Sequence, residues 1–284
     1  MHAVSVVVPV GAWTGDARAQ VDAIHGQLDD HGSELIVVDN TPDCVHALLG
    51  KTLPAGRVRV VCAHDVRSPS HARNAGAAAA RGQIVAFTDA DDLVMPGWLA
   101  QLVAPFSDRM VGIVGGRLDE SALNSRASAA TRKGLTTTGL PTGFYFRPYV
   151  PSGNLAVRGE LLRAAGGFRA EAVGAEDIDF SWRVLELGTR AAYAADAVVC
   201  VRYRIGTLAS CLQGFRWGRG GARLVRRWQV DRPGAGPRLP SAGYRLAALR
   251  NSALATWRTR AVTPFARQLC YQVGLVAGAL QVGA

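Results

Sequence analysis

The stretch that most constrains this chain is residues 84–92, where five residues suited to a buried strand lead directly into three carboxylates. An apolar run of this length predicts a strand covered on both faces. Asp89, Asp91 and Asp92 then lie at the carboxyl end of that strand, where open α/β sheets keep their ligand crevice. Three like charges repel one another, and hard oxygen ligands suit Mg²⁺ or Mn²⁺. The stretch therefore predicts a divalent-metal site; the competing interpretation is a solvated acidic turn before a helix near Pro96.

Strands and helices alternate up to about residue 205. Apolar runs predict strands, and Ala-rich or amphipathic runs predict helices. The expected strands are residues 4–10, 34–39, 57–63, 84–88, 110–118 and 191–201, and the expected helices are residues 16–28, 69–81, 159–165 and 178–187. Such alternation indicates βαβ units with right-handed crossovers. We therefore expect an α/β fold with a mostly parallel central sheet and flanking helices.

The composition changes near residue 202. Residues 202–267 contain fourteen arginines and a single acid, Asp231, and the chain beyond them carries no charge. We place a boundary near residue 205. One α/β domain is expected over residues 1–205, and an Arg-rich, mostly helical region over residues 206–284.

The basic C-terminal region bears on the partners of the protein, whose formal net charge is +10. Its helices also carry Trp217, Trp228, Tyr244 and Trp257, and an uncharged apolar end follows. These features are typical of an element that lies on an anionic membrane surface, and a lipid-linked diphosphate would suit the same charge. Nucleic acid is not expected, because no RNA- or DNA-binding motif accompanies the charge. The competing interpretation is a solvated charged face beside a core helix.

Cysteine usage indicates a cytoplasmic protein, and the basic C-terminal region leads us to expect it on the inner face of the cell membrane. The five cysteines are widely spaced and show no metal-type pairing, so we expect reduced thiols in the core of the protein. No uncharged apolar run reaches the roughly 20 residues needed to span a bilayer, and we expect no signal peptide. The first strand is not followed by GxGxxG, and GxxxxGK[ST] does not occur, which disfavours an NAD enzyme and a P-loop protein.

Two candidate residues lie at the ends of early elements. Asp39 ends the second strand, where a carboxylate can accept a hydrogen bond from a ribose or a base. Its alternative role is a turn-forming Asp-Asn pair before Pro42. Arg73, at the start of a helix, could pair with a phosphate or fix Asp89, and its alternative is a solvent-exposed arginine.

Two further candidate groups lie later in the chain. Glu176 and Asp177 stand just before an expected helix, where Asp is a favoured N-cap. A helix N-terminus stabilises an ionised carboxylate, so Asp177 could also act as a base. Within the basic region, Arg216 could meet a diphosphate and Trp217 could stack on an acceptor ring, with Gln213 close by. The alternative is a helix with one aromatic on its core side.

Taken in order, the motifs resemble those of the family 2 glycosyltransferases, inverting, nucleotide-sugar-dependent enzymes of the GT-A fold. The motifs are VSVVVPV, VVDN, ARNAG, FTDADD, GNLAVRGELLRAAGGF and AEDIDFSWRVLELG. The resemblance covers about residues 4–205. It implies a Rossmann-like GT-A domain and hexosyl transfer from a nucleoside-diphosphate sugar to a saccharide or lipid-linked acceptor, in cell-envelope polysaccharide or glycolipid synthesis.

On the donor side, the resemblance assigns roles to four aspartates. Asp39 would hold the nucleotide base. Asp89 and Asp91 fill the DxD pattern that binds the ribose and a divalent metal (Mg²⁺ or Mn²⁺) on the donor diphosphate, with Asp92 adjacent. Whether Asp91 or Asp92 contacts the metal directly stays open.

On the acceptor side, the resemblance implies that Asp177 is the catalytic base, with Glu176 beside it. Asp177 would take the proton of the acceptor hydroxyl, whose oxygen attacks the anomeric carbon opposite the leaving group, so that configuration inverts. Gly153 and Asn154 would line the sugar or acceptor side of the site.

Gln213, Arg216 and Trp217 match the spacing of the QxxRW element found in processive members of the family. Those members carry membrane-spanning helices near this element, so we do not infer polymerisation here. The chain also departs from the family at the end of the first strand, where Gly11 and Ala12 replace the usual turn. That departure puts the local nucleotide contacts in doubt.

Two other functions compete with sugar transfer. A haloacid-type phosphatase would use Asp89 and Asp91, but such enzymes need a threonine shortly after the second aspartate, and this chain continues with Asp92 and Leu93. A non-catalytic nucleotide-sugar or membrane-binding module with a GT-A fold is the other alternative. The intact acidic positions argue against it.

Overall fold

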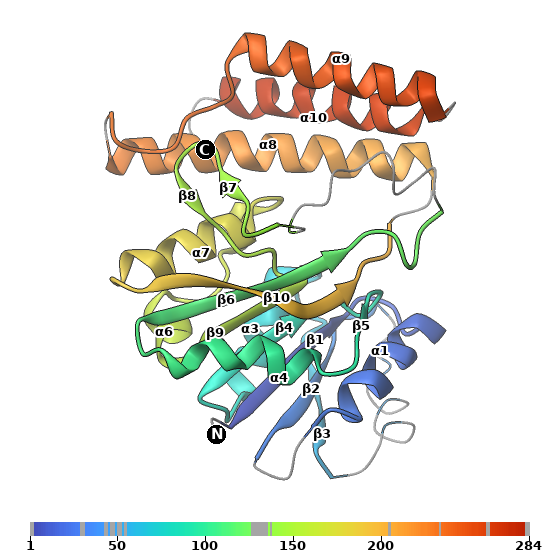
Figure 1. The fold of residues 1–284 in the computed structure, drawn as a ribbon, viewed down its shortest axis with the longest axis vertical. Helices are drawn as coiled ribbons and strands as arrows, with labels where there is room; N and C mark the ends of the chain where they lie inside the picture. Colours follow the sequence, from blue (N-terminus) through green and yellow to red (C-terminus); the bar gives the residue numbers. More distant parts are fainter. Residues whose placement is uncertain are drawn as a thin grey trace.

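A computed structural model describes residues 3–28, 32–42, 45, 49, 53, 56–125, 136, 138–203, 206–232, 234–259 and 262–281. Its centre is an eight-stranded sheet in the order β3-β2-β1-β4-β9-β6-β10-β5 (Figure 1). The strands are β1 (Val4–Val10), β2 (Glu34–Asp39), β3 (Val58–Cys62), β4 (Ile84–Thr88), β5 (Leu93–Val94), β6 (Val111–Asp119), β9 (Asn154–Arg158) and β10 (Arg190–Cys200). A separate hairpin joins β7 (Thr142–Gly143) to β8 (Arg147–Pro148).

The predicted mostly parallel sheet is confirmed, with two antiparallel strands: β9 at its centre and the short edge strand β5, which pairs with β10. Strands β3, β2, β1 and β4 are parallel neighbours, and β6 is parallel to β10. Strand β9 lies antiparallel between β4 and β6, and its register pairs Thr88 with Asn154. The chain that enters β9 therefore meets the acidic loop that leaves β4.

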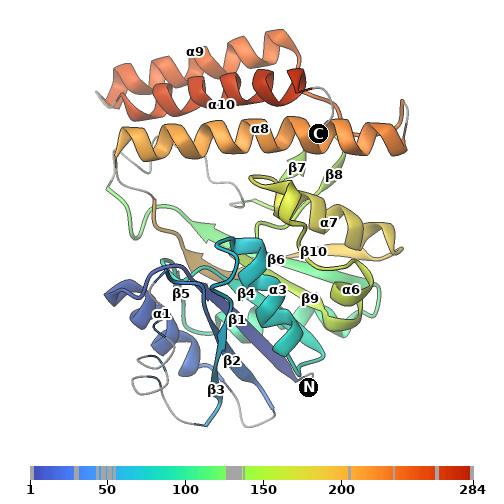
Figure 2. The same cartoon turned by 180° about the vertical axis from the view of Figure 1, so that it is seen from behind.

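Apolar side chains on both faces of the sheet explain why its strands have almost uninterrupted hydrophobic sequences. One face is covered by α1 (Gly15–His25) and α4 (Trp98–Val103), followed by η1 (Ala104–Ser107). The other face is covered by α3 (Pro69–Ala79), α6 (Gly159–Ala164) and α7 (Glu176–Glu186), as the reverse view shows (Figure 2). A short η2 turn (Ala170–Ala172) precedes α7.

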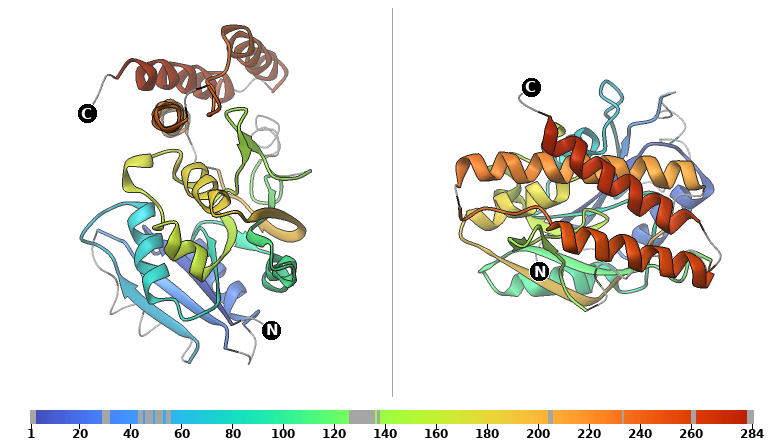
Figure 3. Two further views of the ribbon diagram at one scale, coloured as in Figure 1. Left: turned by 90° about the vertical axis from the view of Figure 1, so that its left-hand side faces the viewer. Right: turned by 90° about the horizontal axis from the view of Figure 1, so that it is seen from above.

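The C-terminal region forms a helical layer of α8 (Thr207–Asp231), α9 (Ala242–Thr259) and α10 (Thr263–Leu280). Helix α8 lies next to the α/β part, and α9 and α10 lie outside it (Figure 3). Helices α8 and α10 approach so closely that a Cβ at Gly218 would collide with the Tyr271 carbonyl, and one at Gly274 with the Phe215 carbonyl. None of the helices within the described residues is both long and apolar enough to cross a bilayer.

The structure confirms most of the predicted elements and adds some that were not expected. Strands β5, β7, β8 and β9 were not predicted. The described cysteines are free thiols, but the expectation that they lie in the core is wrong for most of them: Cys200 is buried, Cys62 is exposed, and Cys211 and Cys270 are half-buried.

Candidate active site

The acidic loop after β4 is held in one conformation by Gln20, a buried side chain of α1. The Gln20 amide nitrogen donates to Thr88 Oγ1 at 3.0 Å and to the Asp89 carbonyl at 3.1 Å. Its amide oxygen accepts from the Val94 backbone N–H at 2.9 Å. Gln20 thus bridges the two ends of the loop, and a polar residue buried on an otherwise apolar helix face was the signal for it in the sequence.

Two of the three aspartates in this loop turn their oxygens toward Gly153. A Cβ placed on Gly153 would lie 3.2 Å from Asp89 Oδ2 and 3.5 Å from Asp92 Oδ2. Asp92 is buried, and burial, followed by the charge of Asp89 and then that of Asp91, raises its pKa to about 8. This is the crowding of like charges that the sequence predicted. Asp91 is exposed.

A divalent cation fits this arrangement when a phosphate completes its coordination. Within the described residues no three carboxylate, histidine or cysteine groups form a complete metal site. Mg²⁺-type sites commonly use one or two carboxylates together with substrate phosphates. The oxygens of Asp89 and Asp92 beside Gly153 supply hard donors of that kind. Burial, and then the negative charge of Asp89, raises the pKa of Asp92, and a cation would balance that charge.

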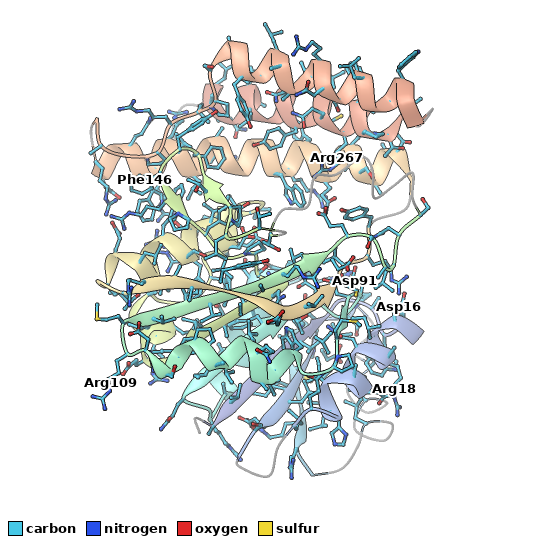
Figure 4. All side chains as sticks on the ribbon, viewed as in Figure 1. Asp16, Arg18, Asp91, Arg109, Phe146 and Arg267 are labelled. Carbon is cyan, nitrogen blue, oxygen red and sulfur yellow. The ribbon has the colours of Figure 1, made fainter. Side chains whose placement is uncertain are left out.

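Arg202, which follows β10, secures the other side of the loop. Its backbone N–H donates to Asp92 Oδ1 at 2.9 Å and its guanidinium to the Asp91 carbonyl at 3.3 Å. The same guanidinium pairs with Asp16 Oδ1 at 2.8 Å. Figure 4 shows Asp91 and Asp16 close together at one end of the sheet. Sequence reasoning missed Arg202 because its partners are far away along the chain.

Asp39 lies at the carboxyl end of β2 and is fully buried. Its Oδ1 accepts from the Thr41 backbone N–H at 3.0 Å and from Thr41 Oγ1 at 2.7 Å, so part of the carboxylate does organise the turn. Its Oδ2 is buried without a hydrogen-bond partner among the described residues. Buried polar atoms are rarely left unpaired, so this oxygen is available to a ligand donor.

Arg73 of α3 connects the acidic loop with the start of α7. Its Nη2 donates to Asp89 Oδ1 at 2.7 Å, and its side chain is only 5 % exposed. Burial opposes its positive charge, but the charges of Asp89, Glu176 and Asp177 together outweigh burial and raise its pKa. Nε and Nη1 of Arg73 have no partner among the described residues. Pairing with Asp89 was one of the two roles expected for Arg73.

Glu176 and Asp177 occupy the first turn of α7. The N-cap residue is Ala175, so the alternative interpretation of Asp177 as the N-cap is wrong. Asp177 Oδ1 accepts from the Ile178 N–H at 2.8 Å, and Glu176 Oε2 accepts from the Gly174 N–H at 2.7 Å. Each acid therefore satisfies a backbone donor near the start of the helix, where such donors lack intrahelical partners.

Asp177 titrates near neutral pH. Burial and then the charge of Glu176 raise its pKa to about 7, while the Ile178 N–H and the charge of Arg73 oppose that rise. Burial thus outweighs the stabilisation of the ionised form that the helix N-terminus led us to expect. A carboxylate with a pKa near the working pH is well suited to general-base chemistry. Tyr149 is a neighbour that the sequence did not indicate; burial, with the charge of Asp177, raises its pKa.

The QxxRW residues of α8 pack against the turn that leads into α7. A Cβ on Gly174 would lie 2.6 Å from the Arg216 carbonyl and 3.2 Å from the Trp217 Cα. The side chains of Arg216 and Trp217 are exposed, and the Arg267 guanidinium lies 4.9 Å from the centre of a Trp217 ring. Gln213 lies one turn earlier and is half-buried. The structure therefore brings this element beside the residues that precede Glu176.

A buried ionic group fixes α7 to α8. Asp179 is 1 % exposed and pairs with Arg183 at 2.8 Å, while Trp228 Nε1 of α8 donates to its Oδ1 at 3.1 Å. Sequence reasoning missed Asp179, although an Asp with an Arg four residues later is a recognisable helical pair. This group positions the helix that carries Asp177.

Asn154 is placed differently from its neighbour Gly153. Its amide oxygen accepts from Trp98 Nε1 at 2.9 Å, and its amide nitrogen donates to the carbonyls of Arg117 and Ala197. These bonds tie β9 to β6, β10 and α4. Gly153 borders the carboxylates, whereas the Asn154 amide is engaged within the protein.

The chain is similar in sequence to known glycosyltransferases. The family model for Glycosyl transferase family 2 matches residues 16–169. The pre-mycofactocin glycosyltransferase of Mycobacterium tuberculosis is 30 % identical over 71 % of this chain and 43 % of its own length. Glycosyltransferase AglE of Haloferax volcanii is 26 % identical over 81 % of this chain and 75 % of its own length. The chain thus spans less than half of the mycobacterial relative.

The fold is also that of solved glycosyltransferases. The mannosyltransferase PcManGT of Pyrobaculum calidifontis, in complex with GDP-Man and Mn²⁺, superposes with a TM-score of 0.62 at 20 % identity. The match covers 97 % of this chain and 87 % of the mannosyltransferase, which confirms the predicted GT-A architecture with its C-terminal helices. Since the family model matches more than half of its residues, the chain belongs to glycosyltransferase family 2.

Proposed function

We propose that the protein is an inverting glycosyltransferase that moves a sugar from a nucleoside-diphosphate donor to an acceptor hydroxyl. The observation that carries the proposal is the placement of Arg73. Its guanidinium pairs with Asp89 of the candidate metal site and is stabilised by the charges of Glu176 and Asp177. A donor-binding group and a base are thus close neighbours, as transfer between two bound substrates requires.

The donor is expected to lie along the carboxyl ends of β2 and β4. The unpartnered Oδ2 of Asp39 can accept from the nucleoside, and the facing oxygens of Asp89 and Asp92 can hold Mg²⁺ or Mn²⁺ on the diphosphate. When bound, that cation neutralises charge on the leaving nucleoside diphosphate as a Lewis acid. The proposal assigns direct metal contact to Asp89 and Asp92, with Asp91 at the exposed rim.

Asp177 is the proposed base. Its pKa of about 7 lets it accept the acceptor proton near neutral pH, and general-base help typically contributes about 10² to 10⁴ in rate. One base and direct attack opposite the leaving group give inversion. Arg216 and Trp217, beside the turn before Glu176, are proposed to contact the acceptor or the donor diphosphate, with Gln213 supporting them.

The proposed acceptor is a saccharide or a lipid-linked saccharide used in cell-envelope synthesis. The support for this class is chemical: residues 202–267 hold fourteen arginines and one acid, which suits a diphosphate-bearing acceptor. The sugar and the nucleotide base of the donor have to be identified by measurement. A screen of UDP-, GDP- and dTDP-sugars for Mn²⁺-dependent hydrolysis identifies the donor.

The decisive test compares Asp177→Asn with its neighbour, Glu176→Gln, as a matched control. Asp177→Asn should abolish transfer while Mn²⁺-dependent titration of the nucleoside diphosphate stays unchanged. The product of the wild-type enzyme should have inverted anomeric configuration by NMR. Glu176→Gln should keep most of the activity, with the acid limb of its pH profile at lower pH, because the charge of Glu176 raises the pKa of Asp177. Full turnover in Asp177→Asn removes Asp177 as the base. Nucleotide binding without turnover on any donor favours a non-catalytic module.

A further inference from the structure

The outermost surface of the protein carries exposed apolar side chains at helical spacing. On α9 the residues are Leu246, Leu254 and Trp257, which are 67 %, 46 % and 79 % exposed. On α10 they are Leu269, Val273, Val276 and Leu280, spaced four, three and four residues apart. Residues at this spacing share one side of a helix. We call these seven residues, together with Arg250, the outer face.

The outer face points away from the rest of the protein. Gly274 and Gly278 put the opposite side of α10 against α8, since a side chain at either position would collide with α8 backbone. Val273 and Val276 flank these contacts along the chain but lie on the exposed side of the helix. Figure 3 shows α9 and α10 as the layer farthest from the central sheet. No described element covers the outer face.

Charge distinguishes the outer face from an ordinary apolar patch. Residues 242–281 include arginines but no Asp or Glu. Arg250 is exposed and follows Leu246 by one turn, so it lies within the α9 row. Leucine, valine and tryptophan beside arginine, without acids, are the composition of helices that lie in the interface of an anionic membrane. A second copy of this chain would instead place arginines against arginines.

We propose that the outer face lies on the surface of a bilayer containing anionic lipids, with α9 and α10 parallel to the membrane plane. Trp257 and the aliphatic side chains enter the boundary between head groups and acyl chains, and Arg250 meets the lipid phosphates. Helix α8 then lies between the bilayer and the acidic residues at the start of α7. The proposal concerns lipid binding and does not depend on the transfer reaction.

Sedimentation with vesicles tests the proposal directly. The wild-type protein should sediment with vesicles of equal parts phosphatidylglycerol and phosphatidylcholine, and much less with phosphatidylcholine alone. Trp257→Ser combined with Val273→Ser should weaken binding about tenfold or more. Arg250→Gln should weaken it about fivefold, the equivalent of about 1 kcal/mol per basic residue, and less at high salt.

A matched control removes an equally exposed apolar side chain elsewhere. Met110, 52 % exposed, adjoins Arg109, which Figure 4 places far from the helical layer. Met110→Ser should bind vesicles as the wild type does, and circular dichroism should show all variants folded. Equal binding by the outer-face variants and the wild type overturns the proposal. A dimer in analytical ultracentrifugation that the same variants dissociate assigns the outer face to a second copy and also overturns it.

Discussion

Arg73 donates from Nη2 to Asp89 Oδ1 at 2.7 Å, and this ion pair places a buried positive charge beside two further acids. The same charge holds down the pKa of Asp177, which burial raises to about 7. Asp89 and Asp177 are separated by 88 positions in the sequence, yet both interact with the Arg73 guanidinium. The donor and acceptor halves of the proposed site are therefore electrostatically linked through Arg73.

The first prediction concerns the pH dependence of transfer. Because Asp177 must be deprotonated to act as a base and its pKa is about 7, kcat/KM should fall about tenfold per pH unit below that value. Above it the rate should level off. Initial rates at saturating Mn²⁺ across this range check the prediction, with Asp22→Asn, an exposed aspartate of α1 paired with Arg18, as a carboxylate control. A rate independent of pH between 5 and 8 would contradict it.

Replacing Arg73 should move that pH profile. Arg73→Gln removes the positive charge that lowers the pKa of Asp177, so the acid limb of kcat/KM should shift to higher pH. Release of Asp89 should also weaken Mn²⁺-dependent nucleotide binding, measured by calorimetry. Arg73→Lys keeps the charge and should leave the limb close to its original position. If the acid limb of kcat/KM lies at the same pH in Arg73→Gln as in the wild type, Arg73 has a packing role only.

Gly153→Ala should impair metal-dependent donor binding. The new methyl group would sit 3.2 Å from Asp89 Oδ2, which would have to move by a few tenths of an ångström, and 3.5 Å from Asp92 Oδ2, which is ordinary contact. We expect the Mn²⁺ dependence of nucleotide affinity to fall about tenfold, with little change in thermal stability. Gly15→Ala, where a Cβ would meet nothing within 4 Å, is the control and should behave as wild type. Normal metal dependence in Gly153→Ala would move the metal site elsewhere.

Trp228→Phe should loosen the contact between α7 and α8. The change removes the hydrogen bond from Trp228 Nε1 to the buried Asp179 carboxylate. A hydrogen bond to a charged group contributes about 1.5–3 kcal/mol, so the urea midpoint should fall measurably. Trp257→Phe alters an exposed tryptophan and should leave the midpoint unchanged. Equal midpoints for the two variants would show that this bond contributes little to stability.

Local sequence patterns predicted the parallel strands well, because most of them have a nearly continuous apolar sequence and β3 alternates basic with apolar residues. They did not predict β9, whose five residues lie antiparallel between β4 and β6. Its place is set by pairing with strands far away in the chain, which periodicity does not encode. Helix α7 begins two residues before residue 178, where the sequence predicts its start, because the acidic pair forms its first turn.

The acidic residues at strand and helix ends were visible in the sequence, but the groups that hold them were not. Gln20 and Arg202 act on the acidic loop across 68 to 111 positions of sequence. Their partners follow only from the fold. The roles of Asp39, Arg216 and Trp217 in substrate binding stay predictions, and so does the division of the chain near residue 205.

The glycines between α8 and the turn before α7 have a mechanical consequence. At Gly174 and Gly220 the two segments meet backbone against backbone, with no side chain between them. Side-chain rotamer changes cannot compensate for a movement of α8 at such a contact. A tilt of α8 therefore displaces the turn that leads into α7. The carboxylate of Asp177 is three residues from Gly174. A change in the position of the helical layer therefore also changes the orientation of Asp177, the proposed base.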